Sequence, residues 1–260
     1  MENIKGKWAL ITGASSGIGE AVAKKLASEG CNLILCARKK EKLEILKKDF
    51  IKNYGIKVEV FSVDVRLLVS VNIFTKNVRN LGITPHFLIN NAGLAKGLEP
   101  VQNGIIDNWE AMIDTNLKGL LYITKSFLSE MIKQGSGHIV NIGSTAGWQT
   151  YPGGNVYNAT KFGVRALSDA MSLDLVNTDI KVSCVAPGSC ETNFTKVRFN
   201  GDENKSHELY SSYKSLEAKD VADMIFYILN APEHVNIPYV RIMAKDQRNS
   251  YVIRKNIINE

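Results

Sequence analysis

Residues 12–19 read Thr12-Gly13-Ala14-Ser15-Ser16-Gly17-Ile18-Gly19 and connect an apolar run to an amphipathic segment. Gly13 permits a tight turn, Gly17 allows the backbone to approach a phosphate, and Gly19 lets a helix pack closely on the preceding strand. A helix that begins here points free N–H groups at an anion. The stretch therefore predicts a strand, a turn and a helix that bind a dinucleotide pyrophosphate. Because its G-x-x-x-G-x-G spacing is wider than that of many such sites, a plain glycine-rich turn is the alternative.

Apolar runs and amphipathic segments alternate along the rest of the chain. Strands that are apolar on both faces and alternate with helices are typical of a parallel sheet covered on both sides, so we expect an α/β fold with a doubly wound sheet. The predicted strands are Trp8–Thr12, Asn32–Ala37, Val58–Val63, Phe87–Asn90, His138–Gly143, Lys181–Ala186 and Tyr239–Met243. The predicted helices are Gly17–Glu29, Lys39–Tyr54, Leu67–Leu81, Trp109–Lys133, Val156–Val176 and Lys219–Asn230.

The 260 residues contain no linker, repeat or low-complexity stretch, so we expect a single domain over residues 1–260. Residues 188–217 depart from the alternating pattern because they are long, polar and weakly periodic. A loop of that length in a compact domain usually serves a function. We predict that this segment is a lid over the active site, with short helices allowed inside it.

The charge pattern disfavours nucleic acid and membranes as partners. The chain is 45% hydrophobic and 22% charged, with a net charge of +6. A basic balance can indicate nucleic acid, but the lysines are dispersed, and the densest cluster, residues 39–48, alternates with glutamates. No apolar run approaches the roughly 20 residues that span a bilayer. A phosphate-rich cofactor would use part of the positive excess.

The four cysteines favour a reducing compartment. Cys31, Cys36 and Cys184 fall in apolar runs, which predicts buried thiols rather than disulfides, and Cys190 is expected in a loop. No C-x-x-C motif or histidine cluster is present, so no metal site is expected. The first predicted strand begins at Trp8, which leaves no room for a signal peptide. We expect a cytoplasmic protein.

Cations follow the second predicted strand, which ends Leu35-Cys36-Ala37-Arg38-Lys39. An NAD site would place an acid here to bind the ribose 2′-hydroxyl. A guanidinium instead suits a 2′-phosphate, through paired hydrogen bonds and stacking on adenine. The position of Arg38 therefore favours NADP over NAD. The alternative is a solvated helix start, although cations there oppose the helix dipole.

Polar residues also follow the third and fourth predicted strands. Asp64 could accept a hydrogen bond from the adenine amino group, or it could cap the next helix. In Asn90-Asn91-Ala92-Gly93, side-chain amides could tie neighbouring strands and Gly93 could let the backbone pass the cofactor ribose. A plain turn is the alternative for this second stretch.

A serine, a tyrosine and a lysine form the candidate catalytic set. Tyr157 and Lys161 stand four residues apart, and Ser144 lies thirteen positions before Tyr157 at the end of an apolar run. The chain holds two more Tyr-x-x-x-Lys copies, at 210–214 and 251–255, but neither has a hydroxyl residue thirteen positions earlier. The spacing therefore selects the copy at Tyr157.

These side chains could transfer one proton and hold one oxygen. Residues four apart share a helix face, so Lys161 should lie beside Tyr157. A nearby ammonium, together with the positive ring of an oxidised nicotinamide, is expected to lower the pKa of the phenol from about 10. Tyr157 could then exchange a proton with an alcohol or carbonyl, while Ser144 holds the same oxygen. Asn116 could hold a water that relays protons from Lys161, or it could be a surface or kink residue.

Together these motifs resemble the short-chain dehydrogenase/reductase family over nearly the whole chain. Residues 12–19 match its TGxxxGIG, residues 90–93 its NNAG, and residues 116, 144, 157 and 161 its catalytic tetrad of Asn116, Ser144, Tyr157 and Lys161. Pro187-Gly188 with Thr192 matches its PG-xxx-T, whose threonine contacts the nicotinamide carboxamide. The resemblance implies one Rossmann-type domain with a seven-stranded parallel sheet, and a homotetramer. The predicted cofactor contacts are Gly13, Ser15, Ser16, Gly17, Ile18, Gly19, Arg38, Asp64, Asn91, Ala92, Gly93, Tyr157, Lys161, Pro187, Gly188 and Thr192.

Longer stretches are similar to one group within that family. They are NNAGLAKGLEP, MIDTNLKGLLYITK, HIVNIGSTAGWQTYPGGNVYNATK, VRFNGD and APEHVNI. These resemble the NADP-dependent 3-hydroxy acid dehydrogenases, which act on serine, allo-threonine and related short 3-hydroxy acids. Lys219 and the tail beyond Ala244 depart from that group's pattern. The resemblance implies an oxidoreductase that transfers a hydride between NADP(H) and a short 3-hydroxy acid.

Recognition of such an acid requires a cation that the tetrad does not supply, because Lys161 is committed to Tyr157 and the ribose. Arg198 in the predicted lid could bind the carboxylate, with Lys196 as the alternative and a solvated lid cation as the third possibility. Two other functions stay open. One is a carbonyl or 3-oxoacyl-carrier-protein reductase, to which Lys96 or Lys196 could offer a basic docking surface. The other is a non-catalytic NADP-binding regulatory protein, which the intact set of Ser144, Tyr157 and Lys161 disfavours.

Overall fold

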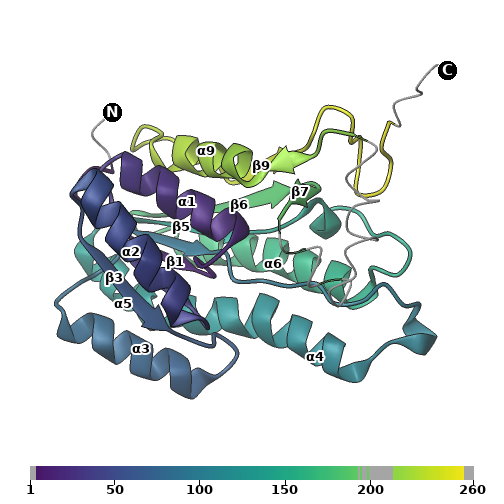
Figure 1. Cartoon of the computed structure of the whole chain (residues 1–260), viewed down its shortest axis with the longest axis horizontal. Coiled ribbons are helices and arrows are strands. Elements are labelled where there is room, and N and C mark those ends of the chain that lie inside the picture. The colour runs from purple at the N-terminus through teal and green to yellow at the C-terminus, as the bar shows by residue number, and fades with distance from the viewer. Residues whose placement is uncertain (1–3, 193, 195–197, 199–212, 255–260) are drawn as a thin grey trace.

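A seven-stranded parallel sheet forms the centre of the molecule (Figure 1). The computed structural model describes residues 4–192, 194, 198 and 213–254. The strands run in the order β3-β2-β1-β4-β5-β6-β9, and every neighbouring pair is parallel. The strands are β1 (Trp8–Thr12), β2 (Asn32–Ala37), β3 (Val58–Ser62), β4 (Phe87–Asn90), β5 (Gly137–Ile142), β6 (Ile180–Pro187) and β9 (Tyr239–Ile242). The predicted α/β fold with a doubly wound sheet is confirmed, and each strand lies within a residue or so of its predicted bounds.

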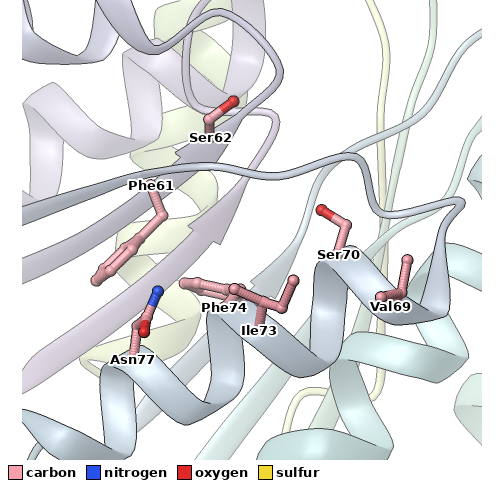
Figure 2. A pocket seen from close by; sticks show the side chains of 7 residues that line it. All are labelled: Phe61, Ser62, Val69, Ser70, Ile73, Phe74 and Asn77. Atoms are coloured by element: carbon pink, nitrogen blue, oxygen red, sulfur yellow. The ribbon is translucent and has the colours of Figure 1, made fainter.

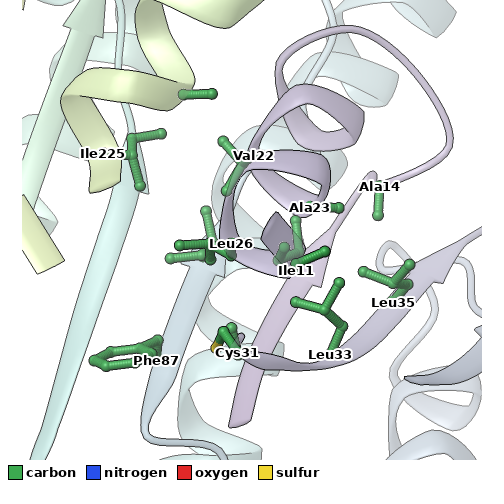
Figure 3. Packing of buried hydrophobic residues seen from close by; sticks show 14 of the residues in the cluster. Ile11, Ala14, Val22, Ala23, Leu26, Cys31, Leu33, Leu35, Phe87 and Ile225 are labelled. Atoms are coloured by element: carbon green, nitrogen blue, oxygen red, sulfur yellow. The ribbon is translucent and has the colours of Figure 1, made fainter. Parts of the chain in front are cut away.

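Alternate residues of the strands face two separate apolar layers. Leu10 on β1 faces a cluster with helices α3, α5 and α6, whereas Ile11 faces a cluster with α1, α2 and α9. Figure 3 shows the second layer, in which Val22 and Leu26 of α1 pack toward Ile225 of α9. Both faces of the sheet are thus removed from water, which is why the strands read as unbroken apolar runs.

The helices cover both faces of this sheet. They are α1 (Gly17–Ser28), α2 (Lys40–Tyr54), α3 (Leu68–Asn80), α4 (Ile106–Ile113), α5 (Leu120–Gln134), α6 (Asn155–Asp174) and α9 (Ala218–Leu229). Short 3₁₀ turns, η1 (Val101–Asn103) and η3 (Thr145–Gly147), precede α4 and α6. Within the described part of the chain, no helix has the length and apolar character needed to cross a membrane.

One predicted helix, Trp109–Lys133, differs from the structure. It begins earlier, at Ile106, and a π-helical segment, η2 (Asp114–Gly119), separates α4 from α5. Gly119 lies so close to the chain after β3 that a Cβ there would stand 2.7 Å from Val65 Cγ2. A π-helical turn changes the direction of side chains along a helix, and here the segment contains Asn116.

The predicted lid, residues 188–217, falls mostly outside the described residues. Its two ends form a short parallel pair, β7 (Cys190–Glu191) with β8 (Leu216–Glu217). Cys190, which we expected in a loop, lies in β7. Cys31, Cys36 and Cys184 are buried free thiols, as predicted. Burial raises the pKa of the Cys31 and Cys36 thiols to about 12.

The amino-terminal end of the sheet contains a buried histidine that must be neutral. His138 Nε2 lies 2.7 Å from Ser183 Oγ, and Ser183 Oγ donates its hydrogen to Ile237 O at 2.7 Å. Because the hydroxyl has one hydrogen, Nε2 must be the donor to it. Nδ1 is buried and no described residue pairs with it, so a proton on Nδ1 would lack an acceptor. Burial lowers the pKa of His138 to about 3.

We therefore expect His138 to destabilise the fold in acid. The unfolded histidine binds a proton near pH 6.5, so its contribution is fully present above that pH and is lost as pH falls toward about 3. Each pH unit in this range costs up to about 1.4 kcal/mol. Urea unfolding at pH 6.5 and 4.5 should show a steeper loss of unfolding free energy for the wild type than for His138→Gln. The matched change at the exposed His234, His234→Gln, should keep the wild-type slope, and equal slopes in all three proteins would contradict the assignment.

Candidate active site

A cavity of about 700 Å³ opens at the carboxyl ends of the strands. The strand order reverses between β1 and β4, and ligands of such sheets bind at that crevice. The predicted site residues that line the cavity are Gly13, Ser15, Ser16, Gly17, Ile18, Arg38, Asp64, Asn91, Ala92, Gly93, Ser144, Tyr157, Lys161, Pro187, Gly188, Thr192 and Arg198. Gly19 and Asn116 stand behind the cavity wall, and Lys196 lies outside the described residues.

The glycine-rich turn has the close backbone packing that a phosphate cradle needs. Gly13 and Gly17 have φ of +66° and +58°, a region that favours glycine. A Cβ on Gly19 would stand 2.5 Å from Gly13 O, so the first turn of α1 packs directly on the end of β1. Ser16 precedes α1 without capping it through its side chain, which leaves N–H groups at the helix start for an anion.

Side-chain amides at the end of β4 hold this turn and the neighbouring strands in place. Asn91 Nδ2 donates to Thr12 O at 2.8 Å, and Thr12 Oγ1 accepts from Ala92 N at 2.9 Å. Asn90 Nδ2 donates to Asn141 Oδ1 on β5 at 2.9 Å. The predicted tie between neighbouring strands is confirmed.

The end of the cavity next to β2 and β3 is lined by four cations. Arg38, Lys39, Lys42 and Arg66 all line it, and Asp64 is the carboxylate among them. Asp64 does not cap α3, whose first turn follows Leu67. It accepts instead from the Arg66 guanidinium, with Nη2 to Oδ2 at 2.6 Å, and this hydrogen bond lowers the pKa of Asp64.

Arg66 was not predicted from the sequence. Its guanidinium occupies the Asp64 carboxylate on both oxygens, so the net character of this end of the cavity is positive. That charge suits a phosphate. The only sequence signal was its place two residues after Asp64, next to the end of a strand.

Ser144 and Tyr157 meet at the opposite end of the cavity. The Ser144 hydroxyl lies close enough to Tyr157 to lower the pKa of the phenol. Ser144 Oγ accepts from Ala146 N at 3.1 Å, which fixes the serine at the start of η3. The Tyr157 ring packs 5.8 Å from the Phe194 ring. One substrate oxygen could therefore contact both hydroxyl groups.

Lys161 lies on the same helix face as Tyr157, as expected. Its Nζ donates to Ile142 O at 2.8 Å and stands 5.9 Å from the centre of the Tyr157 ring. Burial lowers the pKa of Lys161 to about 8. The ammonium therefore lies deep in the wall, facing the strand end rather than open water.

We expected a lowered pKa for Tyr157, but the groups of the protein alone raise it. Burial raises it to about 12. The Ser144 hydroxyl and the Arg198 charge oppose that rise without overcoming it. Within the protein, burial outweighs the nearby cations, so the Tyr157 phenol is neutral at pH 7.

Asn116 connects the site to the chain behind it. Its Nδ2 donates to Leu94 O at 2.9 Å and to Thr160 Oγ1 at 3.0 Å, and its Oδ1 accepts from Leu94 N at 2.9 Å. These bonds tie the loop after β4 to the helix that contains Tyr157 and Lys161. The water relay remains a prediction, because both the Nδ2 and the Oδ1 of Asn116 are hydrogen-bonded to protein atoms here.

An arginine from the predicted lid reaches the end of the cavity that contains Ser144 and Tyr157. Arg198 Nη2 donates to the Tyr151 hydroxyl at 2.8 Å, and its guanidinium lies 5.5 Å from the Tyr157 ring centre. Gly97 N donates to Arg198 O at 3.0 Å and anchors the backbone. Arg198 Nε is buried, and no described residue accepts from it. The sequence did not single out Tyr151.

A smaller hollow of about 270 Å³ lies between β3 and α3 (Figure 2). It is lined by Phe61, Ser62, Val69, Ser70, Ile73, Phe74 and Asn77. None of these side chains is an acid, a base or a cysteine. Its polar side chains are two serines and one asparagine, and none of them titrates near neutral pH as a general acid or base would.

Comparison with known proteins finds enzymes that are similar to this chain over most of its length. NADP-dependent 3-hydroxy acid dehydrogenase YdfG of Salmonella typhi is 38% identical over 239 residues, covering 92% of this chain and 95% of the relative. Sulfoacetaldehyde reductase 2 of Chromohalobacter salexigens is 40% identical over 239 residues, covering 92% and 94%.

A solved structure and a family pattern agree with these relatives. The closed form of serine dehydrogenase complexed with NADP+ superposes with a TM-score of 0.88 at 37% identity, covering 92% of this chain and 96% of that one. The short chain dehydrogenase family pattern matches residues 7–203. The chain belongs to the short-chain dehydrogenase family.

Proposed function

We propose that the protein transfers a hydride between NADP(H) and the carbon that bears the hydroxyl of a short 3-hydroxy acid. The observation that carries the substrate class is Arg198. It sets a guanidinium beside Tyr151 and Tyr157, and among the described residues none accepts from its buried Nε. A 3-hydroxy acid has its carboxylate two bonds from the reacting carbon, and a guanidinium is well shaped to bind it.

The residues of the cavity fit NADP(H). The tight packing at Gly13 and Gly19 leaves the helix start open to a pyrophosphate, and the cations around Arg38 suit a 2′-phosphate. Thr192 stands beside Gly17, because a Cβ added to Gly17 would lie 3.3 Å from Thr192 Cβ. NADP(H), when bound, supplies or accepts the hydride, and its oxidised ring carries a positive charge.

The side chains of this protein would handle the proton. In reduction, neutral Tyr157 donates its proton to the carbonyl oxygen, and in oxidation the phenolate takes the proton from the alcohol. Ser144 holds the same oxygen and stabilises charge that develops on it. Lys161, held by Ile142 O, favours the phenolate that forms.

Arg198→Ala should lower kcat/KM for 3-hydroxypropanoate about tenfold to a hundredfold, because a hydrogen bond to a charged group contributes roughly 1.5–3 kcal/mol. The uncharged methyl ester should be affected much less. Steady-state assays of NADPH absorbance on both substrates measure the difference. Arg79→Ala, which removes a guanidinium on α3 that does not line the cavity, is the control. An equal loss on acid and ester, or no loss on either, would remove Arg198 from the substrate site.

The same arginine gives a second candidate substrate class. A hydroxyalkyl sulfonate such as 2-hydroxyethanesulfonate also has its anion two bonds from the reacting carbon, and a relative at 40% identity is named a sulfoacetaldehyde reductase. Including this sulfonate in the assay separates the two classes. A higher kcat/KM for the sulfonate would assign the protein to it.

We also propose that residues 1–260 act as one domain, that the chain assembles as a homotetramer, and that it works in the cytoplasm. A single sheet that extends from β1 to β9 supports the first proposal. Buried thiols at Cys31, Cys36 and Cys184 suit a reducing compartment. The homotetramer rests on the family resemblance, and light scattering of the purified protein tests it.

A further inference from the structure

The chain after β9 turns back on itself as a hairpin. Gln247 and Ile253 form an antiparallel bridge. Arg248 N donates to Val252 O at 2.8 Å, and Arg254 N donates to Asp246 O at 2.8 Å. We call residues 244–254 the C-terminal hairpin. It lies outside residues 7–203, the part that matches the family pattern.

A buried glutamine fixes the base of the C-terminal hairpin to the cavity wall. Gln247 is 3% exposed, and its Oε1 accepts from Ser189 N at 2.9 Å while its Nε2 donates to Asn249 O at 2.9 Å. Gly188 lies so close that a Cβ there would stand 2.2 Å from Gln247 Oε1. The hairpin is therefore packed against the loop that follows β6.

One ion pair joins the two strands of the hairpin near its open end. Arg254 Nη2 lies 2.7 Å from Asp246 Oδ1, and the Asp246 side chain is 6% exposed. A carboxylate removed from water is costly unless it is paired. The pair therefore holds the returning strand against the outgoing one.

The tip of the hairpin contacts the opposite wall. Gln149 Nε2 donates to the Tyr251 hydroxyl at 3.4 Å, and Ser250 Oγ donates to Gln149 O at 3.5 Å. Gln149 stands two residues before Tyr151, which binds Arg198. The hairpin thus extends from Ser189 on one wall to Gln149 on the other, across the catalytic end of the cavity.

Four hairpin residues line the cavity, namely Gln247, Ser250, Tyr251 and Ile253. We propose that the C-terminal hairpin is the outer wall of the substrate pocket and that the Tyr251 ring limits the pocket to short acids. This specificity role rests on the proposed function, because it assumes that an acid binds at Arg198. Tyr251 is 56% exposed, so its ring borders the mouth of the cavity rather than the protein core.

The expected preference for short over long acids follows from the space that the Tyr251 ring fills. One methylene group that does not fit a pocket changes specificity by about 10- to 200-fold. Removing the ring should relieve this restriction for an acid with a longer carbon chain. It should not affect the cations Arg38, Lys39, Lys42 and Arg66, which line the end of the cavity beside β2 and β3.

The test is Tyr251→Ala against 3-hydroxypropanoate and 3-hydroxyhexanoate, together with calorimetric binding of propanoate and hexanoate to the protein saturated with NADP+. We expect the ratio of hexanoate to propanoate affinity, and the matching ratio of kcat/KM, to rise at least tenfold. Affinity for NADP+ should stay within about twofold. Tyr251→Phe keeps the ring and should keep the wild-type ratios, and Tyr227→Ala, at an exposed tyrosine of α9, should do the same.

Several results would overturn the proposal. They are unchanged ratios in Tyr251→Ala, a rise in Tyr227→Ala that equals it, or no binding of either carboxylate to any of these proteins. Loss of NADP+ affinity in Tyr251→Ala would assign the hairpin to the cofactor instead. Because the simple carboxylates are not turned over, their binding tests the wall even if the wild type fails to oxidise any 3-hydroxy acid. That second failure would reject only the proposed reaction.

Discussion

Tyr157→Phe is expected to lower kcat at least a hundredfold and to leave NADP affinity within about twofold. The phenol is the group proposed to exchange a proton with the substrate oxygen, and general acid–base catalysis contributes roughly 10²- to 10⁴-fold. The ring is kept, so its packing against Phe194 should persist. The phenol hydroxyl next to Ser144 is lost, but Ser144 Oγ still accepts from Ala146 N and should keep its position.

Steady-state turnover in both directions measures the effect, and fluorescence titration with NADPH measures cofactor binding. Tyr227→Phe removes a phenol hydroxyl from the exposed side of α9 and should behave as the wild type. A Tyr157→Phe enzyme with near wild-type turnover would show that another group moves the proton. A loss of turnover that follows a loss of NADPH binding would assign Tyr157 to the cofactor rather than to the chemistry.

The sheet could be predicted from the sequence because its strands carry their signal locally. Residues such as Leu10 and Ile11 face different layers yet are both apolar, so the run itself marks a strand buried on two sides. The turn at glycines 13, 17 and 19 could also be predicted from the sequence, because close packing leaves no room for a Cβ at Gly19. The bounds of the helices after β4 were harder to predict, since the π-helical segment between α4 and α5 has no distinct apolar period.

Residues that act through distant contacts could not be predicted in the same way. Tyr151 matters because Arg198 reaches its hydroxyl from 47 positions away. Gln247 fixes the C-terminal hairpin through Ser189, which is 58 positions away. Periodicity describes neighbours along the chain, so it does not reveal such pairs. The pKa of Tyr157 differed for a similar reason, because the degree of burial depends on the whole fold.

The largest expected effect on cofactor choice comes from Arg38→Asp. Arg38 follows the last residue of β2 and lines the cavity together with Lys39, Lys42 and Arg66. Replacing the guanidinium by a carboxylate removes a charged hydrogen bond worth roughly 1.5–3 kcal/mol and adds repulsion from a 2′-phosphate, so kcat/KM with NADP should fall at least tenfold. NAD should lose much less, because a carboxylate at this place can accept from a ribose 2′-hydroxyl.

Parallel assays with NADP and NAD, repeated at low and high salt, measure this change in preference. Lys48→Asp makes the same change of charge on an exposed turn of α2 that does not line the cavity, and should shift neither cofactor more than about twofold. Because salt screens long-range attraction more than a direct contact, the Arg38→Asp loss should persist at high salt. A wild-type preference for NAD, or an equal loss with both cofactors in Arg38→Asp, would show that Arg38 does not contact the 2′-phosphate.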